Sequence, residues 1–304
     1  MPAYNEAEHI TNVIHGIPDF VDHILVVDDA STDNTAEAAR SAAASRVEIT
    51  RHSSNQGLGA ALITGHKRAI ELNADICAVM AGDDQMDPRY LPNLLDAIID
   101  EGYDYAKGNR FIISGLEKMP KLRIFGNSVL SFLTKAASGY WRIFDPQNGY
   151  TAIRVKVLKS LELDAMQHGY QFENDMLVRL NILGCRVKDV PIPAVYKGER
   201  SKVRLLPFAI RTSICLFNGF RMRLYRKYIL YDLHPFAVLY LTGALLFLWS
   251  LLLSSYFFYI RYLSPQRISP STGSVMIAVA PLFIGIQLLL TALLVDLEEG
   301  RRLS

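Results

Sequence analysis

Residues Val79–Pro88, VMAGDDQMDP, decide how this chain can fold. The apolar run Ile76–Ala81 has the composition of a buried strand, and Gly82 ends it. Four polar residues then precede the helix that Pro88 opens: Asp83, Asp84, Gln85 and Asp87. Carboxylate and amide oxygens at the carboxyl end of a strand suit a hard divalent cation that also holds a diphosphate. The alternative, an acidic turn that only caps a helix, fits the same residues, so the rest of the chain must decide.

A strand–turn–helix alternation runs through the first hundred residues. Besides the strand before Gly82, strands are expected at Ile24–Asp28 and Val47–Thr50. Helical spacing or helix-start signals cover residues 6–17, 33–44, 55–72 and 90–101. The alternation predicts an α/β fold with a mainly parallel sheet and helices on both faces. Ligands bind beyond the carboxyl ends of such strands, so we expect the loops at residues 2–6, 28–29 and 83–85 on one rim.

The sequence PAYNE, Pro2–Glu6, is typical of the loop that follows a strand, yet only Met1 precedes it. A parallel sheet needs a strand leading into this loop. We therefore expect the first strand to be missing from this chain and encoded upstream, rich in β-branched residues. Its absence would expose the edges of the neighbouring strands and lower stability.

Charge is distributed unevenly along the 304 residues, although the net charge is only +2. Residues 1–196 carry 19 Lys and Arg against 25 Asp and Glu, whereas residues 197–227 carry 9 against 1. An acidic domain followed by a basic segment favours a membrane surface over nucleic acid. Three cysteines, an odd number in apolar stretches, indicate reduced thiols and a domain that faces the cytosol.

Two uncharged apolar runs near the carboxyl end, residues 236–260 and 274–295, each exceed the ~20 residues that cross a bilayer as a helix. A short link, Arg261–Gly273, joins them into a two-helix transmembrane hairpin. Residues 206–232 mix apolar and basic side chains, including Arg211, Arg221, Arg223 and Arg226, and predict an interfacial amphipathic helix with a basic face. Because positive charge precedes the first span, we expect both chain ends, including a tail at residues 296–304, in the cytoplasm.

Eight segments in order resemble a family 2 glycosyltransferase with the GT-A fold: PAYNE, VVDDASTDNT, NQGLGAA, GDDQMDP, KGNRF, FGN, DPQNGY and SK. The subgroup that the chain resembles most contains dolichol-phosphate mannose synthase and polyprenyl-phosphate glycosyltransferases of bacteria. The resemblance covers about residues 1–205. It implies transfer of a hexose from a nucleoside-diphosphate sugar, GDP-mannose first and UDP-glucose second, to a polyprenyl or dolichyl phosphate.

The resemblance also implies roles for individual residues. It assigns eleven residues to the nucleotide sugar: Pro2, Ala3, Tyr4, Glu6, Asp28, Asn55, Asp83, Asp84, Gln147, Arg200 and Lys202. Of these, Arg200 and Lys202, with Ser201 between them, belong to a segment that closes over the diphosphate. Asp84 takes a place where a small residue is common, so we expect it to be solvated. Asp29 either binds ligand or caps a helix, and Gly57 and Gly59 fit a plain helix start better than a phosphate site.

A divalent cation, Mg²⁺ or Mn²⁺, is implied at Asp83 and Gln85. The family commonly carries another aspartate where this chain has Ala81, which puts the metal affinity in doubt. By the same resemblance, Arg110, Arg123 and Asn127 hold the acceptor phosphate, and Asp145, Gln147 and Asn148 line the sugar pocket. Glu173 and Asp175 stand where many members carry a catalytic base.

A phosphate acceptor changes what the site must do. Its second pKa is about 6, so it is already largely dianionic at neutral pH and needs no base. Glu173 and Asp175 are then expected to orient the sugar or an arginine, and the transfer to be inverting. Two alternatives stay open, a hydroxyl acceptor in cell-surface glycan synthesis and a decayed, non-catalytic membrane scaffold. A processive polysaccharide synthase is disfavoured, because the sequence lacks a Gln-x-x-Arg-Trp motif and has only the hairpin.

Overall fold

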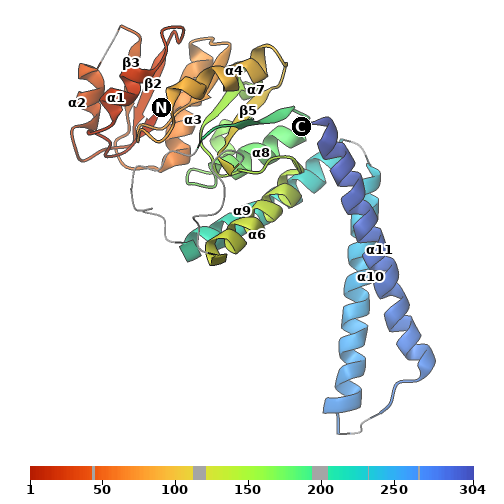
Figure 1. Ribbon diagram of the computed structural model, residues 1–304. Helices are drawn as coiled ribbons and strands as arrows, with labels where there is room; N and C mark the ends of the chain where they lie inside the picture. Colours follow the sequence, from red (N-terminus) through yellow and green to blue (C-terminus); the bar gives the residue numbers. More distant parts are fainter. Residues whose placement is uncertain (43–44, 112–120, 194–204, 232, 266–267) are drawn as a thin grey trace. The chain divides into compact units, whose positions relative to one another are not determined.

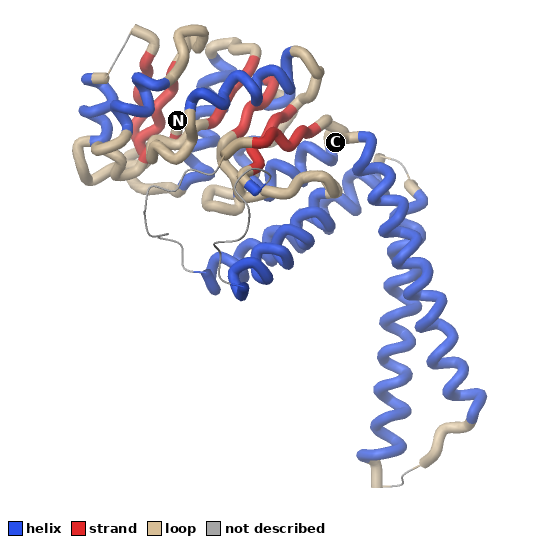
Figure 2. Tube along the Cα trace, viewed as in Figure 1, coloured by secondary structure: helices blue, strands red, loops and turns tan. Residues whose placement is uncertain are grey.

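The computed structural model describes residues 1–42, 45–111, 121–193, 205–231, 233–265 and 268–304 (Figures 1 and 2). The chain divides into two compact units. The first unit comprises Met1–Arg223 together with Arg302–Ser304, and the second comprises Leu224–Arg301.

The first unit alternates strands and helices. Its strands are β1 (Pro2–Ala3), β2 (Ile24–Asp28), β3 (Val47–Arg51), β4 (Ile76–Val79), β5 (Tyr105–Asn109), β6 (Thr151–Arg154) and β7 (Val187–Pro191). Its α-helices are α1 (Ile10–Gly16), α2 (Thr35–Ser41), α3 (Leu58–Glu71), α4 (Leu91–Ile99), α6 (Lys121–Ser138), α7 (Val155–Leu158), α8 (Phe172–Ile182) and α9 (Leu205–Tyr225). Two short 3₁₀ turns, Pro88–Tyr90 and Leu163–Ala165, precede α4 and α8.

The strands form two sheets in the orders β1-β2-β3 and β4-β6-β5-β7. β1, β2 and β3 run parallel, as do β5 and β7, while β6 is antiparallel to both β4 and β5. Apolar side chains of α1 and α4 pack into one core cluster, and those of α3 and α8 pack into another. The α/β fold with helices on both faces is therefore confirmed; the antiparallel β6 is the feature that the alternation did not predict.

The segment that the sequence assigned wholly to a loop contains β1. Pro2 pairs with Val27 and Ala3 with Asp28, and the amino group of Met1 donates to the carbonyl of Leu25 at 2.7 Å. Gly82, at the end of the β4 segment, donates to the carbonyl of Pro2 at 3.2 Å. Two residues thus link the two sheets directly below the PAYNE loop.

One face of α9 packs on the first unit, and another carries apolar side chains into solvent. Thr212 is buried against Gln171, while Ile210, Ile214 and Phe217 form an exposed stripe. The expected basic face is wrong at Arg223. This residue is only 1% exposed, and its Nη2 donates to the carbonyl of Ala136 in α6 at 2.9 Å, because its position on the helix faces the protein.

The second unit is a helical hairpin of α10 (Pro235–Phe258) and α11 (Thr272–Arg302, whose last residue belongs to the first unit). Single-turn π-helices, Arg226–Leu230 and Tyr259–Leu263, precede and follow α10. Two stretches, Pro235–Leu263 and Thr272–Arg302, are long and apolar enough to cross a membrane; an 18-residue window in each has a mean hydropathy of 2.2 and 2.4, respectively.

The hairpin helices meet at small residues. A Cβ on Gly285 would lie 2.8 Å from the backbone nitrogen of Phe247, so the helix backbones approach closely there. Ser250, also between the helices, donates its hydroxyl to the carbonyl of Ala278. Close backbone approach at small residues is how helices associate in hydrocarbon, where burial of apolar surface gives no driving force.

The last residues of the chain return to the first unit. α11 continues through Arg302, so most of the expected tail at residues 296–304 is helical. Beyond it, the backbone carbonyl of Leu303 accepts from the N–H of Val187 at 2.8 Å, and the Leu303 side chain packs against the α3/α8 core cluster.

Candidate active site

Three loops meet at the carboxyl ends of β1, β2 and β4. Asn5 N–H donates to the hydroxyl of Ser31 at 2.9 Å, and Glu6 N–H donates to that of Thr35 at 2.8 Å. With the contact between Gly82 and Pro2, these bonds place the loops on one rim, as the sequence predicted.

Each of these loops contains a non-glycine residue in the left-handed region, with φ of 58° at Asn5, 61° at Ala30 and 55° at Asp84. Such conformations cost of order 1 kcal/mol or more and cluster at ligand sites. An alanine gives no sequence signal for this geometry, so sequence reasoning missed Ala30. The rim therefore holds three non-glycine residues in a backbone conformation that such residues rarely adopt.

Asp28 is fully buried beneath the rim. Its Oδ1 accepts from the N–H of Ser31 at 2.9 Å. Its Oδ2 lies 3.2 Å from Nε of Arg51, yet it has no aligned hydrogen bond within the described residues. A buried carboxylate oxygen without an aligned donor is costly, and a ligand N–H or hydroxyl would satisfy it.

Asp29 organises the neighbouring loop. It accepts from the backbone N–H groups of Gln56 and Gly57 at 2.9 and 2.8 Å, and it lies 2.7 Å from Nδ1 of His52. These N–H groups belong to the turn that precedes α3 and not to the first turn of a helix, so Asp29 fixes this turn and the described bonds show neither of the two roles left open for it. The exposed Asn55 lies just before this turn.

The start of α3 is covered by backbone. Ala60 N–H donates to the carbonyl of His168 at 3.1 Å, and a Cβ at Gly59 would lie 2.2 Å from the carbonyl oxygen of Gln167. Gly57, at φ 97°, also faces this segment. The glycines therefore allow close packing of two backbones, which agrees with a plain helix start.

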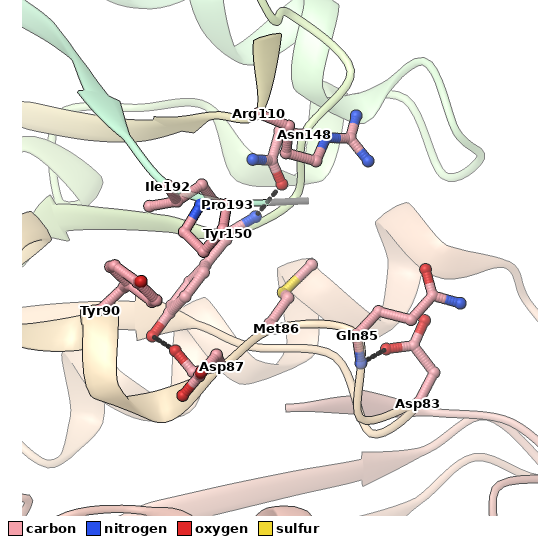
Figure 3. A pocket seen from close by; sticks show the side chains of 10 residues that line it. All are labelled: Asp83, Gln85, Met86, Asp87, Tyr90, Arg110, Asn148, Tyr150, Ile192 and Pro193. Atoms are coloured by element: carbon pink, nitrogen blue, oxygen red, sulfur yellow. Dashed lines mark hydrogen bonds between the residues drawn. The ribbon is translucent and has the colours of Figure 1, made fainter. Parts of the chain in front are cut away.

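A small cavity of about 60 Å³ lies between the turn after β4 and the end of β5 (Figure 3). Ten residues line it: Asp83, Gln85, Met86, Asp87, Tyr90, Arg110, Asn148, Tyr150, Ile192 and Pro193. Asp83 and Gln85 stand on one wall, and Arg110 and Asn148 stand on the other. The sequence predicted roles for all four of these residues.

On the first wall, the side-chain oxygens of Asp83 and Gln85 come from one tight turn. Asp83 Oδ1 accepts from the backbone N–H of Gln85 at 3.2 Å, and the two side chains lie alongside each other in Figure 3. Asp87 caps the following 3₁₀ turn and pairs with Arg89 at 2.6 Å, which leaves it a structural role. Within the described residues, no cluster of three or more His, Cys, Asp or Glu could hold a metal alone.

On the second wall, Arg110 follows β5 directly, at the predicted strand end. Its Nε and Nη2 donate to the two carboxylate oxygens of Asp145 at 2.7 and 3.0 Å. Asp145 is 1% exposed, so this two-pronged ion pair fixes the guanidinium plane at the cavity. Sequence reasoning placed Asp145 in the sugar pocket and missed it as the partner of Arg110.

Beneath this wall lies a buried ionic network. Lys107 is fully buried, and its ammonium contacts the carboxylate of Glu173 at 2.9 Å and the carbonyl of Asn148. Tyr105 donates to the same carboxylate at 3.1 Å. Burial, followed by the charge of Glu173, raises the pKa of Tyr105 well above its ordinary value. Lys107 is the first residue of the KGNRF segment, but the sequence did not predict its ion pair with Glu173.

The second acid of the FEND segment is also engaged away from the cavity. Asp175 accepts from Nε of Arg179 and from the N–H of Gln167, both at 3.2 Å. Burial raises the pKa of Asp175. Neither it nor Glu173 lines the cavity. Gln147 donates to Asn174 at 3.1 Å, which ties the pocket loop to the same helix, α8.

Several predicted site residues cannot be placed. Arg200, Ser201 and Lys202 lie outside the described residues. The backbone of Arg123 and Asn127 belongs to α6, but their side chains are outside the description.

Comparison with known proteins identifies the family of the chain. Residues 1–162 match the model of glycosyl transferase family 2. The chain is 34% identical over 207 residues to polyprenol monophosphomannose synthase of Mycolicibacterium smegmatis, covering 63% of this chain and 74% of that protein. It is 30% identical over 212 residues to the UDP-N-acetylglucosamine–dolichyl-phosphate N-acetylglucosaminyltransferase of Methanococcus voltae, covering 64% and 84%.

The fold has solved counterparts. Glucosyl-3-phosphoglycerate synthase of Mycobacterium tuberculosis, solved with Mn²⁺, UDP-glucose and phosphoglyceric acid, superimposes with a TM-score of 0.53 at 21% identity. The match covers 73% of this chain and 77% of that one, and at this identity it concerns the fold alone. The chain therefore belongs to glycosyl transferase family 2, has the GT-A fold, and is a glycosyltransferase.

Proposed function

We propose that this enzyme is membrane-anchored and transfers a hexose, with inversion, from a nucleoside-diphosphate sugar to a polyprenyl phosphate. The observation that carries the proposal is the cavity with Asp83 and Gln85 on one wall and the Asp145-held Arg110 on the other. Diphosphate and acceptor phosphate repel each other, and these walls offer a metal site and a fixed cation to them. The names of two relatives contain dolichyl phosphate or polyprenol. This supports a polyprenyl phosphate as the acceptor of the present enzyme.

A divalent cation, Mg²⁺ or Mn²⁺, would be held by Asp83 and Gln85, with diphosphate oxygens and water completing its shell. When bound, it would neutralise charge on the departing nucleoside diphosphate. The oxygen donors of the turn suit such a hard ion, and the two-donor set fits a cation that arrives with the nucleotide.

The second wall would place the acceptor. Arg110 presents a guanidinium whose orientation Asp145 fixes, and such a planar group recognises phosphate oxygens in pairs. A phosphate dianion attacks the anomeric carbon without a base. The burial of Glu173 against Lys107 and of Asp175 against Arg179 fits positioning roles for both acids.

The remaining predicted residues keep proposed roles. Asp28, with its buried oxygen, would accept from the base or the ribose, beside Tyr4 and Glu6 on the rim. Pro2, Ala3 and Asn55 would shape the part of the rim that faces the base and the ribose. Four further residues, Arg123, Asn127, Arg200 and Lys202, are proposed for the phosphates on the resemblance alone.

Anchoring rests on the second unit. The chain leaves the first unit after Arg223 and re-enters it at Arg302, so both ends of the hairpin belong on one side of a bilayer. The exposed stripe of Ile210, Ile214 and Phe217 on α9 supports additional contact with the lipid surface. The basic segment before α10 favours the cytoplasmic side.

The activity is tested with the full chain in lipid nanodiscs. Labelled GDP-mannose, UDP-glucose and UDP-N-acetylglucosamine are each offered with polyprenyl phosphate or with the matching polyprenol, with Mg²⁺, Mn²⁺ or EDTA. We expect one nucleotide sugar, GDP-mannose first and UDP-glucose second, to give a lipid product only with the phosphate and only with metal. Product from the polyprenol alone would replace the proposed acceptor by a hydroxyl, and the absence of metal-dependent turnover with any donor would favour the decayed scaffold.

The topology is tested by labelling intact cells with a membrane-impermeant maleimide. Ser271→Cys, exposed in the link between α10 and α11, should react from outside. Asn218→Cys, exposed on α9, serves as the matched control and should react only after the cells are opened. The reverse pattern would overturn the cytoplasmic assignment.

A further inference from the structure

The first turn of α8 contains three buried polar side chains in a row, Glu173, Asn174 and Asp175. The two acids are engaged in ion pairs, Glu173 with Lys107 and Asp175 with Arg179. Asn174 lies between them and is 0% exposed, but it carries no charge and has no part in the reaction proposed above. Its side chain instead contacts two other elements of the first unit.

The carboxamide oxygen of Asn174 joins α6 to the loop that supports Arg110. It accepts from the hydroxyl of Thr134 in α6 and from Nε2 of Gln147, both at 3.1 Å. Thr134 is only 2% exposed, so this connection runs through the interior of the unit. Gln147 belongs to residues 144–149, which we call the wall loop.

The wall loop sets the position of the Arg110 guanidinium. Asp145, in this loop, accepts both of the bonds that Arg110 donates. α6 also contacts the loop near the surface, where Ser131 Oγ donates to the carbonyl of Phe144 at 3.3 Å. A shift of α6 relative to the wall loop would therefore move the support of Arg110.

Asn174 makes its connection at a cost in stability. Its Nδ2 is buried and has no hydrogen-bond partner within the described residues. An apolar side chain of the same shape would bury no unbonded amide. Both partners of its oxygen have alternatives, because Thr134 Oγ1 also lies 2.9 Å from the carbonyl of Leu130, and Gln147 is only half-buried. Stability alone therefore favours an apolar residue at position 174.

We propose that Asn174 is a positioning residue for the acceptor. It holds α6 and the wall loop in one arrangement, so that Arg110 meets the acceptor phosphate in a productive orientation. The inference rests on the proposed function, in which Arg110 binds that phosphate. Asn174 is fully buried and touches no substrate; its effect reaches Arg110 through Gln147 and Asp145, two residues apart in the wall loop.

The test compares variants of the full chain in nanodiscs. Asn174→Leu keeps the branched shape of the side chain and removes both acceptor contacts. Asn174→Asp keeps oxygen atoms that can accept the same two bonds. Thr134→Val removes the contact with α6 alone. Leu180→Ala, at a 0% exposed position of the same helix, leaves a cavity in the core away from these contacts and is the control for stability.

We expect Asn174→Leu to raise the KM for the polyprenyl phosphate about tenfold or more, while the Kd of the nucleoside diphosphate stays within about twofold. Amide hydrogen exchange in the wall loop should become about tenfold faster, with Val187–Pro191 of β7 as the internal reference. The melting temperature should stay within about 2 °C of the unmodified enzyme or rise, because the unbonded amide is gone. A residue with only a structural role would lower it.

The other variants separate positioning from stability. Asn174→Asp should lower the melting temperature by about 5 °C or more, because it buries a carboxyl group between two acids, but it should keep the KM for the acceptor. Leu180→Ala should likewise lower the melting temperature and keep this KM. Thr134→Val should raise the KM less than Asn174→Leu does, and the two changes together should cause no further rise, because they remove the same contact.

Unchanged exchange in the wall loop of Asn174→Leu would overturn the inference, and so would an equal rise in the acceptor KM of Asn174→Asp or Leu180→Ala. The exchange measurement needs no acceptor, so it separates this inference from the proposed function. If the unmodified enzyme forms no product from polyprenyl phosphate, the proposed function fails. Faster exchange in Asn174→Leu would still show that Asn174 positions the wall loop.

Discussion

The two walls of the candidate active-site cavity are built in opposite ways. On one wall, Asp83 and Gln85 are half-buried, and the hydrogen bond that joins them runs from backbone to side chain across a tight turn. On the other, Arg110 rests on the buried Asp145, above the buried pair of Lys107 and Glu173. A wall shaped by backbone conformation can lose a side chain without loss of fold. A wall held by buried charges cannot, because each charge depends on its partner.

The largest effect is expected at Asp83. Asp83→Ala should lower transfer by about three orders of magnitude or more, because the proposed cation loses its charged ligand. The free energy of unfolding should stay within ~0.5 kcal/mol, as is usual for a side chain outside the core. Transfer assays, metal-dependent binding of the nucleotide sugar and thermal unfolding together measure this. Asp100→Asn, exposed directly after α4, is the control and should leave transfer nearly unchanged; an equal loss there would mean that the effect is not specific to the proposed ligand.

The second effect falls on stability. Lys107→Met should lower the free energy of unfolding by about 3–5 kcal/mol, because it leaves the Glu173 carboxylate buried and unpaired. The double variant Lys107→Met with Glu173→Gln should regain a good part of that loss, measured by thermal unfolding in nanodiscs. If the double variant is no more stable than the single one, the pair is not coupled.

Glu173→Gln alone also separates positioning from base catalysis. The amide still accepts from Lys107 and Tyr105, so transfer should fall only about tenfold. Loss of all transfer, with both substrates still bound, would make Glu173 a general base and the acceptor a hydroxyl. The comparison with Asp83→Ala is decisive, because a phosphate nucleophile needs the metal ligand but no base.

The third effect is on the acceptor. Arg110→Lys keeps the charge but loses the two-pronged contact with Asp145, so transfer should fall about 10- to 100-fold. The KM for the polyprenyl phosphate should rise, while binding of the nucleotide sugar stays near that of the unmodified enzyme. A rise confined to the donor KM would place Arg110 on the nucleotide side instead.

The smallest effect concerns Asp189 on β7, behind the charged wall. Its Oδ2 accepts from Asn109 at 2.6 Å and from the N–H of Phe144 at 2.8 Å, while its buried Oδ1 has no partner within the described residues. Burial raises the pKa of Asp189 from 3.8 to about 6. The folded state therefore binds a proton that the unfolded state has released, and this contribution to stability is full below about pH 4 and is lost as pH rises through 6.

Asp189→Asn should remove that contribution to the pH profile of the melting temperature between pH 4 and 6. At pH 7 the variant should be more stable by about 1 kcal/mol, because the amide keeps an acceptor and buries no charge. Thermal unfolding across this pH range is the measurement, with Asp164→Asn, exposed before α8, as control. An unchanged slope would show that other carboxylates dominate.

Local sequence signals predicted many of the helices and strands. The strand at Ile24–Asp28 is found where an apolar run followed by two acids predicted it, and α3 and α4 begin near their glycine and proline signals. The parallel arrangement of the strands also predicted the rim. β6 was not predicted, because its four residues, Thr151–Arg154, have no periodicity that separates a strand from a short helix.

The charged wall was harder to predict, because its pairs are distant in sequence. Arg110 and Asp145 are 35 residues apart, and Lys107 and Glu173 are 66 apart. Nothing local marks such partners, since only tertiary packing brings them together. The burial of Arg223 has the same cause: a basic residue in an amphipathic stretch reads as a surface charge until the facing helix is known.

The docking of Leu303 has a consequence for how the enzyme is made. Its carbonyl accepts a bond from β7, and its partly buried side chain packs against the core cluster of α3 and α8, yet it follows both hairpin helices in the chain. At 5–20 residues per second, the ribosome adds it roughly 4–16 s after Arg223. Until then the nascent first unit lacks one residue that packs against its core. Completion of the first unit thus waits for synthesis of the hairpin, and a chain that stops before Leu303 would leave the ribosome without this contact.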